Sequence, residues 1–468
     1  MEKRVPEKLN RAMISVIMTL AWPTMLEQLL QTAVQYIDTA MVGSLGTQAT
    51  AAVGATSTVN WLVGISLQGL SVGFLAFISR VCGAGEQLKA RRASGQAVLV
   101  ALVVGVLVMA ATLSLSGQIP IWMQADAAIR KMASRYFFTL YTASLFRTML
   151  IIFGTVLRAA GDTKTPLKVN TAVNIINVIL NFCFIYSTRT VVLFGKEILI
   201  PGMGWGVVGA AAASALAFMA GGIAITVALW RHPVVSPRGQ RLRPDMEVLR
   251  PCMKVALPNM LQRFGTSLGY VVFATLINSL GDVSTAAHTI ANTVESAFFI
   301  PGYGMQTATA TLIGNAYGAG DRQRMKDLSA MVIPMEAFLM LLSGGCLFAA
   351  APVLVGIFSD SPEVIALGTT VLRMVAVSEP FFGITIIVEG MMYGVGKTKQ
   401  PLVYNVTCMW LVRIVGTFIC VHWFEMGLVS AWACMIAHNM VLFVLYMLTY
   451  IRGSWNPLRE IAERAEKS

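Results

Sequence analysis

Charged residues are scarce in this sequence. Asp, Glu, Lys and Arg make up 12% of its 468 residues, about half the fraction that is usual in a soluble protein. Apolar residues make up 56%, and apolar runs of roughly 20 residues, long enough to cross a bilayer, recur along the whole chain. This composition excludes a large soluble domain and indicates a polytopic membrane protein.

Motifs for catalysis and nucleotide binding are also missing. The sequence has no HExxH, no GxSxG and no Cys–His cluster, and its seven cysteines are scattered without a CxxC. The segment from Gly390 to Thr398 resembles a Walker A loop, but five residues instead of four separate Gly390 from Gly396. We therefore expect no enzymatic activity and no cofactor, and an ion or substrate gradient as the energy source.

Hydropathy predicts an all-α fold with twelve transmembrane helices. The predicted ranges are 14–42, 51–80, 94–116, 132–157, 168–187, 205–230, 255–279, 286–316, 328–350, 370–394, 402–421 and 427–450. No signal-peptide cleavage site follows the charged N-terminal segment, so we interpret it as a cytoplasmic tail.

Basic residues mark one side of the membrane. With the N-terminus inside, 26 of the 35 Lys and Arg collect on the cytoplasmic side and five fall outside. This is the positive-inside pattern, and it predicts that both termini are cytoplasmic. It also accounts for the net charge of +12 without a nucleic-acid partner. We expect a monomer in the lipid bilayer of the plasma membrane, which is the inner membrane in a bacterium.

The two halves of the chain repeat each other at an offset of 235 residues. The offset pairs Pro23 with Pro258 and Asn170 with Asn405. Each copy holds six spans, so both copies insert with the same orientation, and a parallel pseudo-two-fold axis along the membrane normal is expected. The predicted domains are an N-terminal six-helix bundle over 1–230, a Pro- and Arg-rich cytoplasmic linker over 231–253, and a C-terminal six-helix bundle with its tail over 254–468.

A polar stripe runs along the first predicted span. Its members are spaced 3, 4 and 3 residues apart and therefore lie on one helical face; they are Gln28, Gln31, Gln35 and Asp38. Pro23, fifteen residues before Asp38, removes a backbone hydrogen bond and offers a bend point. A carboxylate inside a span is costly and commonly functional. The alternative is a structural acid that is satisfied in a helix interface.

A stripe of amides runs along the span at 168–187. Its members are spaced 4, 3 and 4 residues apart, and they are Asn170, Asn174, Asn177 and Asn181. Because lipid offers amides no partner, we expect this face to meet the stripe of the first span. Asp38, Asn177 and Asn181 would then form a pocket for a proton or a cation. Interhelical packing through amide hydrogen bonds is the alternative.

The second half carries a different set of polar residues. One face of the span at 255–279 holds Asn259, Gln262, Arg263, Thr266 and Tyr270, and one face of the span at 286–316 holds His288, Asn292 and Glu295. Since an unpaired buried charge is costly, at least one Glu–Arg ion pair is expected. Its candidates are Glu295, Glu379, Glu389, Arg263 and Arg413.

These acids have two interpretations. The ion pairs could lock the second bundle, or Glu295 or Glu389 could carry a second proton or anchor a cationic substrate. We expect His288 to be a hydrogen-bonded helix residue and not a pH switch. Glu27 and Glu336, which follows Pro334 closely, are expected only to pair with neighbours.

The spacing of these motifs resembles the multidrug and toxic compound extrusion (MATE) transporters, a family of the wider multidrug/oligosaccharidyl-lipid/polysaccharide exporter superfamily. The motifs are Pro23-x14-Asp38-Thr39-x3-Gly43, the segment from Pro301 to Gly320, and the loop from Leu157 to Pro166. The resemblance covers nearly the whole chain. It implies two six-helix bundles in a V shape and efflux driven by inward flow of H⁺ or Na⁺.

The resemblance also implies roles for individual residues. In the family, an Asn and a second carboxylate in the fifth span accompany the Asp of the first span, but that second position is Asn181 here. One formal charge then remains, which favours protonation of Asp38; Asp38 would be a Na⁺ ligand only in a sodium-coupled protein. Tyr136 matches a family position near this pocket. Thr266 occupies the place of a family glutamate, so an ion site of that type is not expected in the second half.

We therefore predict a secondary active antiporter that exports organic cations or amphipathic drugs or metabolites in exchange for H⁺ or Na⁺ by alternating access. Protonation of Asp38 would let the first span bend at Pro23. The candidates for the substrate cavity are Gln31, Gln35, Asn174, Gln262, Thr266, Glu295 and Glu389.

Two alternatives are weaker. A lipid-linked saccharide flippase needs a strongly cationic cavity, for which the sequence offers only Arg147, Arg263 and Arg413. A channel usually needs symmetric rings of residues, and two fused homologous bundles fit alternating access better.

Overall fold

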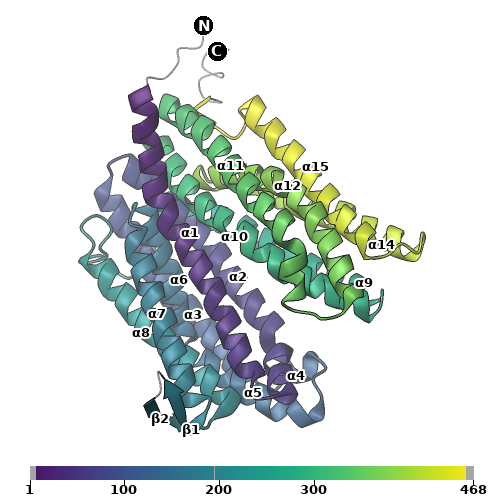
Figure 1. The fold of residues 1–468 in the computed structure, drawn as a ribbon. Helices are drawn as coiled ribbons and strands as arrows, with labels where there is room; N and C mark the ends of the chain where they lie inside the picture. The colour runs from purple at the N-terminus through teal and green to yellow at the C-terminus, as the bar shows by residue number, and fades with distance from the viewer. Residues whose placement is uncertain (1–6, 194–195, 460–468) are drawn as a thin grey trace. The chain divides into compact units, whose positions relative to one another are not determined.

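Long helices dominate the computed structural model, which describes residues 7–193 and 196–459 (Figure 1). The first half contains α1 (Glu7–Gly43), α2 (Thr47–Gly83), α3 (Gln87–Leu115), the short α4 (Ile119–Trp122), α5 (Ala127–Tyr141), α6 (Ser144–Ala159), α7 (Lys164–Phe184) and α8 (Gly206–Arg231). The second half contains α9 (Met246–Asn278), α10 (Asp282–Gly318), α11 (Arg322–Gly356), α12 (Pro362–Gly394), α13 (Lys399–Thr407), the π-helical turn η1 (Cys408–Ile414), α14 (Val415–His422) and α15 (Leu428–Arg452).

All twelve predicted spans fall on these helices. Nine of the described helices are long and apolar enough to cross a membrane, and α5 and α6, which form a pair bent by 48°, bring the number to ten. The remaining two spans are α9 and α10, with 33 and 37 residues. Polar residues such as Asn259, Gln262 and Arg263 make α9 less apolar. The chain is a multi-pass, all-α membrane protein.

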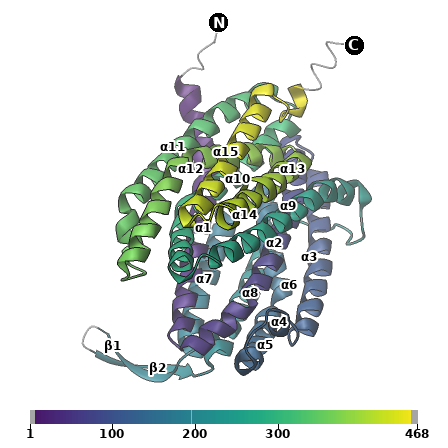
Figure 2. The same ribbon diagram turned by 90° about the vertical axis from the view of Figure 1, so that its right-hand side faces the viewer.

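A β-hairpin, which the sequence analysis did not anticipate, connects α7 to α8. Its strands β1 (Ser187–Leu193) and β2 (Lys196–Met203) pair antiparallel, with Leu193 opposite Lys196. Thr and Val are frequent in β1, and such β-branched residues fit a pleated strand. Figure 2 shows the hairpin extending away from the helices.

The chain folds into two compact units whose segments interleave. Unit 1 contains the described residues of Met1–Gln28, Leu75–Glu86 and Pro251–Ser468, and unit 2 contains Leu29–Phe74 and Gln87–Arg250. Three helices, α1, α2 and α9, therefore contribute to both units. The assignment of 1–230 and 254–468 to two homologous bundles stays a prediction from the sequence repeat.

Small residues bring α7 and α8 close together in unit 2. A Cβ atom added at Gly209 would collide with the carbonyl oxygen of Phe184, and one added at Gly221 would collide with a methyl group of Val173. Small residues allow this approach of helix backbones inside membranes, where close packing stabilises helix pairs. The contact holds the amide stripe of α7 in place beside α8.

The core of unit 1 is built by α10, α11 and α12, which run side by side in Figure 1. Their buried apolar residues include Met305, Ile313, Leu328, Val332 and Met391. The first part of α1 packs here as well, since the Thr24 hydroxyl donates a hydrogen bond to the carbonyl oxygen of Gly304 (2.8 Å).

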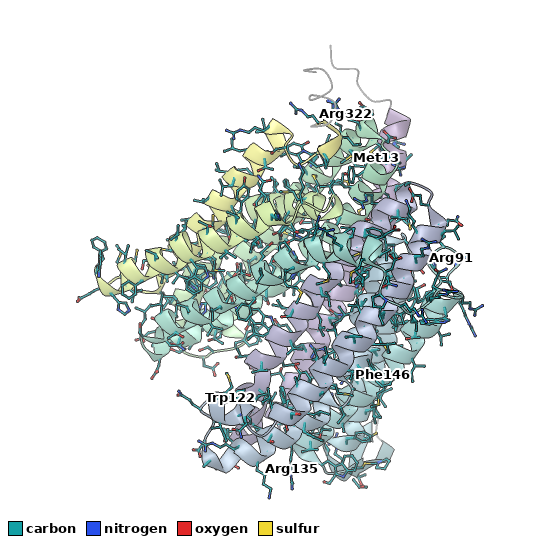
Figure 3. All side chains as sticks on the ribbon, turned by 180° about the vertical axis from the view of Figure 1, so that it is seen from behind. Met13, Arg91, Trp122, Arg135, Phe146 and Arg322 are labelled. Carbon is teal, nitrogen blue, oxygen red and sulfur yellow. The ribbon has the colours of Figure 1, made fainter. Side chains whose placement is uncertain are left out.

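The linker after α8 is fastened to the first turns of α3. The guanidinium of Arg91, labelled in Figure 3, donates to the carbonyl oxygen of Pro233 (2.9 Å). The buried side-chain amide of Gln96 donates to the carbonyl oxygen of Arg243 (2.8 Å) and accepts from the backbone N–H of Asp245 (3.0 Å). The segment between the two halves therefore belongs to unit 2 up to Arg250.

The packing of α1 on α10 predicts a different response at two glycines. A Cβ at Gly304 would overlap the backbone of Met25, so Gly304→Ala should lower the free energy of unfolding by about 1–3 kcal/mol. Gly345 of α11 has nothing within 4 Å of such an atom, so Gly345→Ala should be neutral or stabilise by up to about 1 kcal/mol. Thermal unfolding in detergent measures both, and equal effects would contradict the packing.

Candidate functional site

Asp38 ends a chain of hydrogen bonds that crosses three helices of unit 2. The side-chain amide of Asn181 in α7 donates to the Asp38 carboxylate (Nδ2 to Oδ1, 2.6 Å) and also lies 3.2 Å from Oδ1 of Asn177. The amide of Asn177 donates to the hydroxyl of Ser214 in α8 (3.0 Å). We call these four residues, Ser214, Asn177, Asn181 and Asp38, the Asp38 chain.

One acceptor in the Asp38 chain is left open. Oδ1 of Asn181 is buried and has no hydrogen-bond partner among the residues that the structure describes. A buried acceptor without a donor costs about 1–3 kcal/mol. An ionised carboxylate can only accept, whereas a protonated carboxyl also carries one O–H donor. A proton on Asp38 would therefore supply the donor that Asn181 lacks, while its other oxygen continues to accept from Asn181.

The other residues predicted near Asp38 lie at different distances from this chain. Tyr136 packs against an apolar cluster that includes Met41 and Ile185, each about one turn from a member of the chain. Asn174 is half-buried, and its side-chain nitrogen has no partner among the described residues. Gln31 and Gln35 are exposed and take no part in the Asp38 chain.

Pro23 is buried inside an uninterrupted α1. It belongs to the part of α1 that packs on α10, whereas Asp38 belongs to the part in unit 2. The proposed bend point therefore lies on the opposite side of the Gln28–Leu29 unit boundary from the acid.

A second polar group of unit 2 surrounds Arg147. The guanidinium donates to Oδ1 of Asn60 (2.6 Å), which also accepts from the hydroxyl of Tyr141 (3.1 Å). The Arg147 guanidinium also lies over the ring of Phe218, 5.6 Å from its centroid. Asn60 was not among the predicted site residues; its nearest polar neighbours in α2 are Thr56, Ser57 and Thr58.

In unit 1, Glu389 of α12 lies at the centre of a buried network. Four donors reach its carboxylate: the amides of Gln262 (2.7 Å), Gln306 (2.8 Å) and Asn405 (2.8 Å), and the hydroxyl of Tyr446 (3.2 Å). These donors come from α9, α10, α13 and α15. The Glu389 network therefore ties five helices together through one carboxylate.

The prediction of a Glu–Arg ion pair was wrong for Glu389, because amides and a hydroxyl contact its carboxylate instead of an arginine. Arg263 donates instead to Oδ1 of Asn259 (3.0 Å). Arg413, turned inward by the π-helical η1, lies 4.1 Å from the ring centroid of Phe273 and 2.9 Å from the sulfur of Met435. Among the residues that the structure describes, neither arginine forms a salt bridge with a glutamate.

The remaining candidates of the second half do not join the Glu389 network. Thr266 donates to the backbone carbonyls of Gln262 and Arg263 in its own helix. Glu295 is buried in α10, and Gln306, which contacts Glu389, lies eleven residues further, about 16 Å of helix rise. Only Gln262 and Glu389 of this predicted set are brought together.

His288 packs edge-on between two aromatic rings. Its ring centroid lies 5.6 Å from that of Phe273 and 5.9 Å from that of Trp432. The histidine is thus part of the packing between α9, α10 and α15.

Several partners in these networks were not predicted from the sequence. They are Ser214, Gln306 and Tyr446, and none of them belongs to a polar stripe that the spacing indicated. Asn405 could have been found, because the repeat pairs it with Asn170 of the amide stripe.

A pocket of about 550 Å³ opens in unit 2 between the loop after α3, α5 and the beginning of α8. Its lining includes Arg135, Phe138 and Trp205, and Figure 3 shows Arg135 near one end of the helices. None of the residues predicted for the site lines this pocket, so it is separate from the Asp38 chain.

The fold is that of the MATE transporters. A crystal structure of MATE in the bent conformation matches with a TM-score of 0.87 at 22% identity, covering 97% of this chain and 98% of that chain. A transporter of the MOP superfamily from Pyrococcus furiosus matches with a TM-score of 0.85 at 23% identity, covering 98% of this chain and 100% of that chain.

The sequence places the chain in the same family. The MatE family model matches residues 23–183 and 258–419, well over half of the chain, and its two matches begin at Pro23 and Pro258. The chain belongs to the MatE family, a family of transporters that is not enzymatic.

Curated relatives cover nearly the full length. A probable multidrug resistance protein NorM of Thermotoga maritima is 27% identical over 439 residues, covering 94% of this chain and 92% of the relative. A probable multidrug resistance protein YpnP of Bacillus subtilis is 25% identical, covering 86% and 87%.

The Glu389 network predicts a large loss of stability in one variant. Glu389→Ala would leave three amides and a hydroxyl without their acceptor, and should lower the free energy of unfolding by about 3 kcal/mol or more. Glu389→Gln keeps one acceptor oxygen and should lose less. Thermal unfolding in detergent measures the order of the two variants.

The matched control is Glu363, an exposed acid in the first turn of the same helix. Glu363→Ala should change stability by less than about 1 kcal/mol. If Glu389→Ala were no worse than this control, the carboxylate would not hold the helices together.

Proposed function

We propose that this protein is an antiporter that exports drug-like organic cations or amphipathic molecules in exchange for protons, with Asp38 as the coupling residue. The Asp38 chain is the observation that carries the proposal. It links one acid to two amides and a hydroxyl on neighbouring helices, and it leaves one amide oxygen ready to accept a hydrogen bond.

Protonation would change the hydrogen bonds of Asp38 in a defined way. The ionised carboxylate accepts from Asn181, and the protonated carboxyl would both accept from and donate to the same amide. The second hydrogen bond would hold α1 more tightly to α7. A proton drives transport only if it binds one conformation more tightly than the other, and the added bond supplies such a difference.

The set of oxygens around Asp38 favours a proton over Na⁺. Hard cations take several oxygen ligands, and here the open ones are the Asp38 carboxylate and Oδ1 of Asn181. Oδ1 of Asn177 already accepts from Asn181. Within residues 7–193 and 196–459, no group of three or more His, Cys, Asp and Glu side chains could hold a metal ion. Sodium coupling is the competing outcome of the experiment below.

The names of the relatives support the proposed substrate class. The curated proteins from Thermotoga maritima and Bacillus subtilis are named probable multidrug resistance proteins, and solved MATE structures include complexes with MaD3S and with MaL6. Broad substrate choice suits polar groups that are open to bound molecules. In this chain we assign contact with the substrate to the exposed Gln31 and Gln35 and to the half-buried Asn174.

The distribution of basic residues supports the proposed orientation. The excess of Lys and Arg in the loops of one side supports cytoplasmic termini, in the inner membrane of a bacterium. Protons would then reach Asp38 from outside and leave to the cytoplasm.

The test is efflux of a fluorescent cationic dye from proteoliposomes, with a pH gradient and a Na⁺ gradient imposed separately. The pH gradient should drive the wild type. Asp38→Asn should reduce this efflux at least about tenfold, because an amide cannot bind the coupling proton. Transport depends on a difference in proton affinity between the two conformations, and each factor of ten in that affinity corresponds to about 1.4 kcal/mol.

A matched control is Asp126, which caps α5 by accepting from the backbone N–H of Ala128 (3.0 Å). Asn is an equally good cap, so Asp126→Asn should leave efflux unchanged. If Asp38→Asn retained pH-driven efflux at the wild-type rate, the Asp38 chain would be structural. If a Na⁺ gradient alone drove the wild type, the coupling ion would be sodium.

A further inference from the structure

Glu336 of α11 is a buried acid that no role assigned above uses. Its side chain is 0% exposed, and neither carboxyl oxygen has a hydrogen-bond partner among the residues that the structure describes. The sequence analysis expected Glu336 to pair with a neighbour, and this expectation was wrong. Its isolation contrasts with Glu389 on the adjacent helix, whose carboxylate receives four donors.

Two glycines make room for the Glu336 side chain. A Cβ atom added at Gly302 of α10 would lie 2.7 Å from Oε1 of Glu336, and one added at Gly383 of α12 would lie 3.3 Å from its Cγ. The side chain of Met340 fills the same gap, since it also approaches both glycine positions. The carboxyl group is thus enclosed by the backbones of two neighbouring helices and one apolar side chain.

The charged and titratable groups around Glu336 offer it no partner. The helices that pack most closely against α11 are α10 and α12, and α15 reaches α11 two turns away from Glu336, where the Tyr450 hydroxyl lies 3.3 Å from that of Ser329. Along α10 the titratable groups nearest to Gly302 are Tyr303, next to it, and Glu295, two turns before it, and along α12 those nearest to Gly383 are Glu379 and Glu389. Glu379 meets α11 at Gly344, two turns away from Glu336, and Glu389 is occupied by its own donors. An ionised carboxylate so isolated from water and donors is very costly, and such groups remain neutral instead.

All three helices carry a proline close to this point. Pro301 directly precedes Gly302, Pro334 lies two residues before Glu336, and Pro380 lies three residues before Gly383. Each proline removes one intrahelical hydrogen bond and weakens its helix locally. The surroundings of Glu336 are therefore the place where α10, α11 and α12 can most easily change their packing.

We propose that Glu336 is a second proton-binding site of this protein, separate from Asp38. The carboxyl group holds a proton while Gly302 and Gly383 enclose it, and it gives the proton up when the three helices separate enough to admit water or another donor. The ligand is the proton alone, because a space so closely enclosed has no room for a metal ion, and no group of three or more His, Cys, Asp and Glu side chains within residues 7–193 and 196–459 could hold one. The site stands independently of the coupling role of Asp38.

Infrared spectroscopy of the purified protein tests the protonation directly. The carbonyl stretching band of a buried, protonated carboxylic acid should be present in the wild type at neutral pH and lose intensity in Glu336→Gln. Glu363→Gln serves as the comparison, because Glu363 is exposed at the start of the adjacent helix and its removal should leave the band of a buried acid unchanged. An unchanged band in Glu336→Gln would overturn the proposal.

The pH dependence of thermal stability provides a second measurement. Because the folded protein holds this proton more tightly than the unfolded chain, the contribution of Glu336 to stability is present at low pH and is lost as the pH rises. Glu336→Gln and the apolar Glu336→Met should both remove this part of the pH dependence between about pH 5 and pH 9.

The two variants protect the test against a simple folding defect. If Glu336→Gln folds poorly, Glu336→Met still fills the space between Gly302 and Gly383 with a side chain of similar size. A pH dependence that is identical in the wild type and in a folded variant would overturn the proposal. Neither measurement involves transport, so failure here is distinct from failure of proton coupling at Asp38.

Discussion

The free-energy cost of a polar group inside the membrane-spanning part governs the arrangement of this protein. Three carboxyl groups meet this cost differently. Among the residues that the structure describes, Glu389 receives four donors from four helices, Asp38 receives one amide whose own oxygen stays open, and Glu336 receives none. A fully satisfied acid fastens helices together, while an incompletely satisfied acid is sensitive to the arrival of a proton.

Glycine residues determine where the helices come close enough for these polar contacts to form. Gly209 and Gly221 bring α8 onto α7, which fixes the helix that carries Asn177 and Asn181. Gly302 and Gly383 enclose Glu336. In each case the missing side chain shapes the surroundings of a polar residue on a neighbouring helix, so the packing and the chemistry depend on the same positions.

The sequence was informative about features that repeat along a helix. Hydropathy located all twelve helical segments, and the spacing of Asp38 and of the asparagines of α7 indicated the two faces that the structure joins through Asn181. Features without a period were missed. Ser214, Gln306 and Tyr446 each contribute one hydroxyl or amide from a distant helix, and no local pattern identifies such a partner. The hairpin of β1 and β2 was not predicted because hydropathy marks only the membrane spans, and both strands fall almost entirely between the spans predicted at 168–187 and 205–230.

The acids of the second half show a further limit of sequence reasoning. A buried carboxylate needs partners, but several amides can replace one arginine, as Gln262, Gln306 and Asn405 do at Glu389. Glu336 differs again, because a carboxyl group can also avoid the cost by remaining neutral.

The interleaving of the two units has a mechanical consequence. The polypeptide passes from one unit to the other at four places: after Gln28, after Phe74, after Glu86 and after Arg250. A residue that loosens or turns the backbone stands near each of them, namely Pro23, Gly73, Gly85 with its φ of 74°, and Pro251. Any rotation of one unit against the other must be taken up as torsion at these four crossings, and three of them lie within helices.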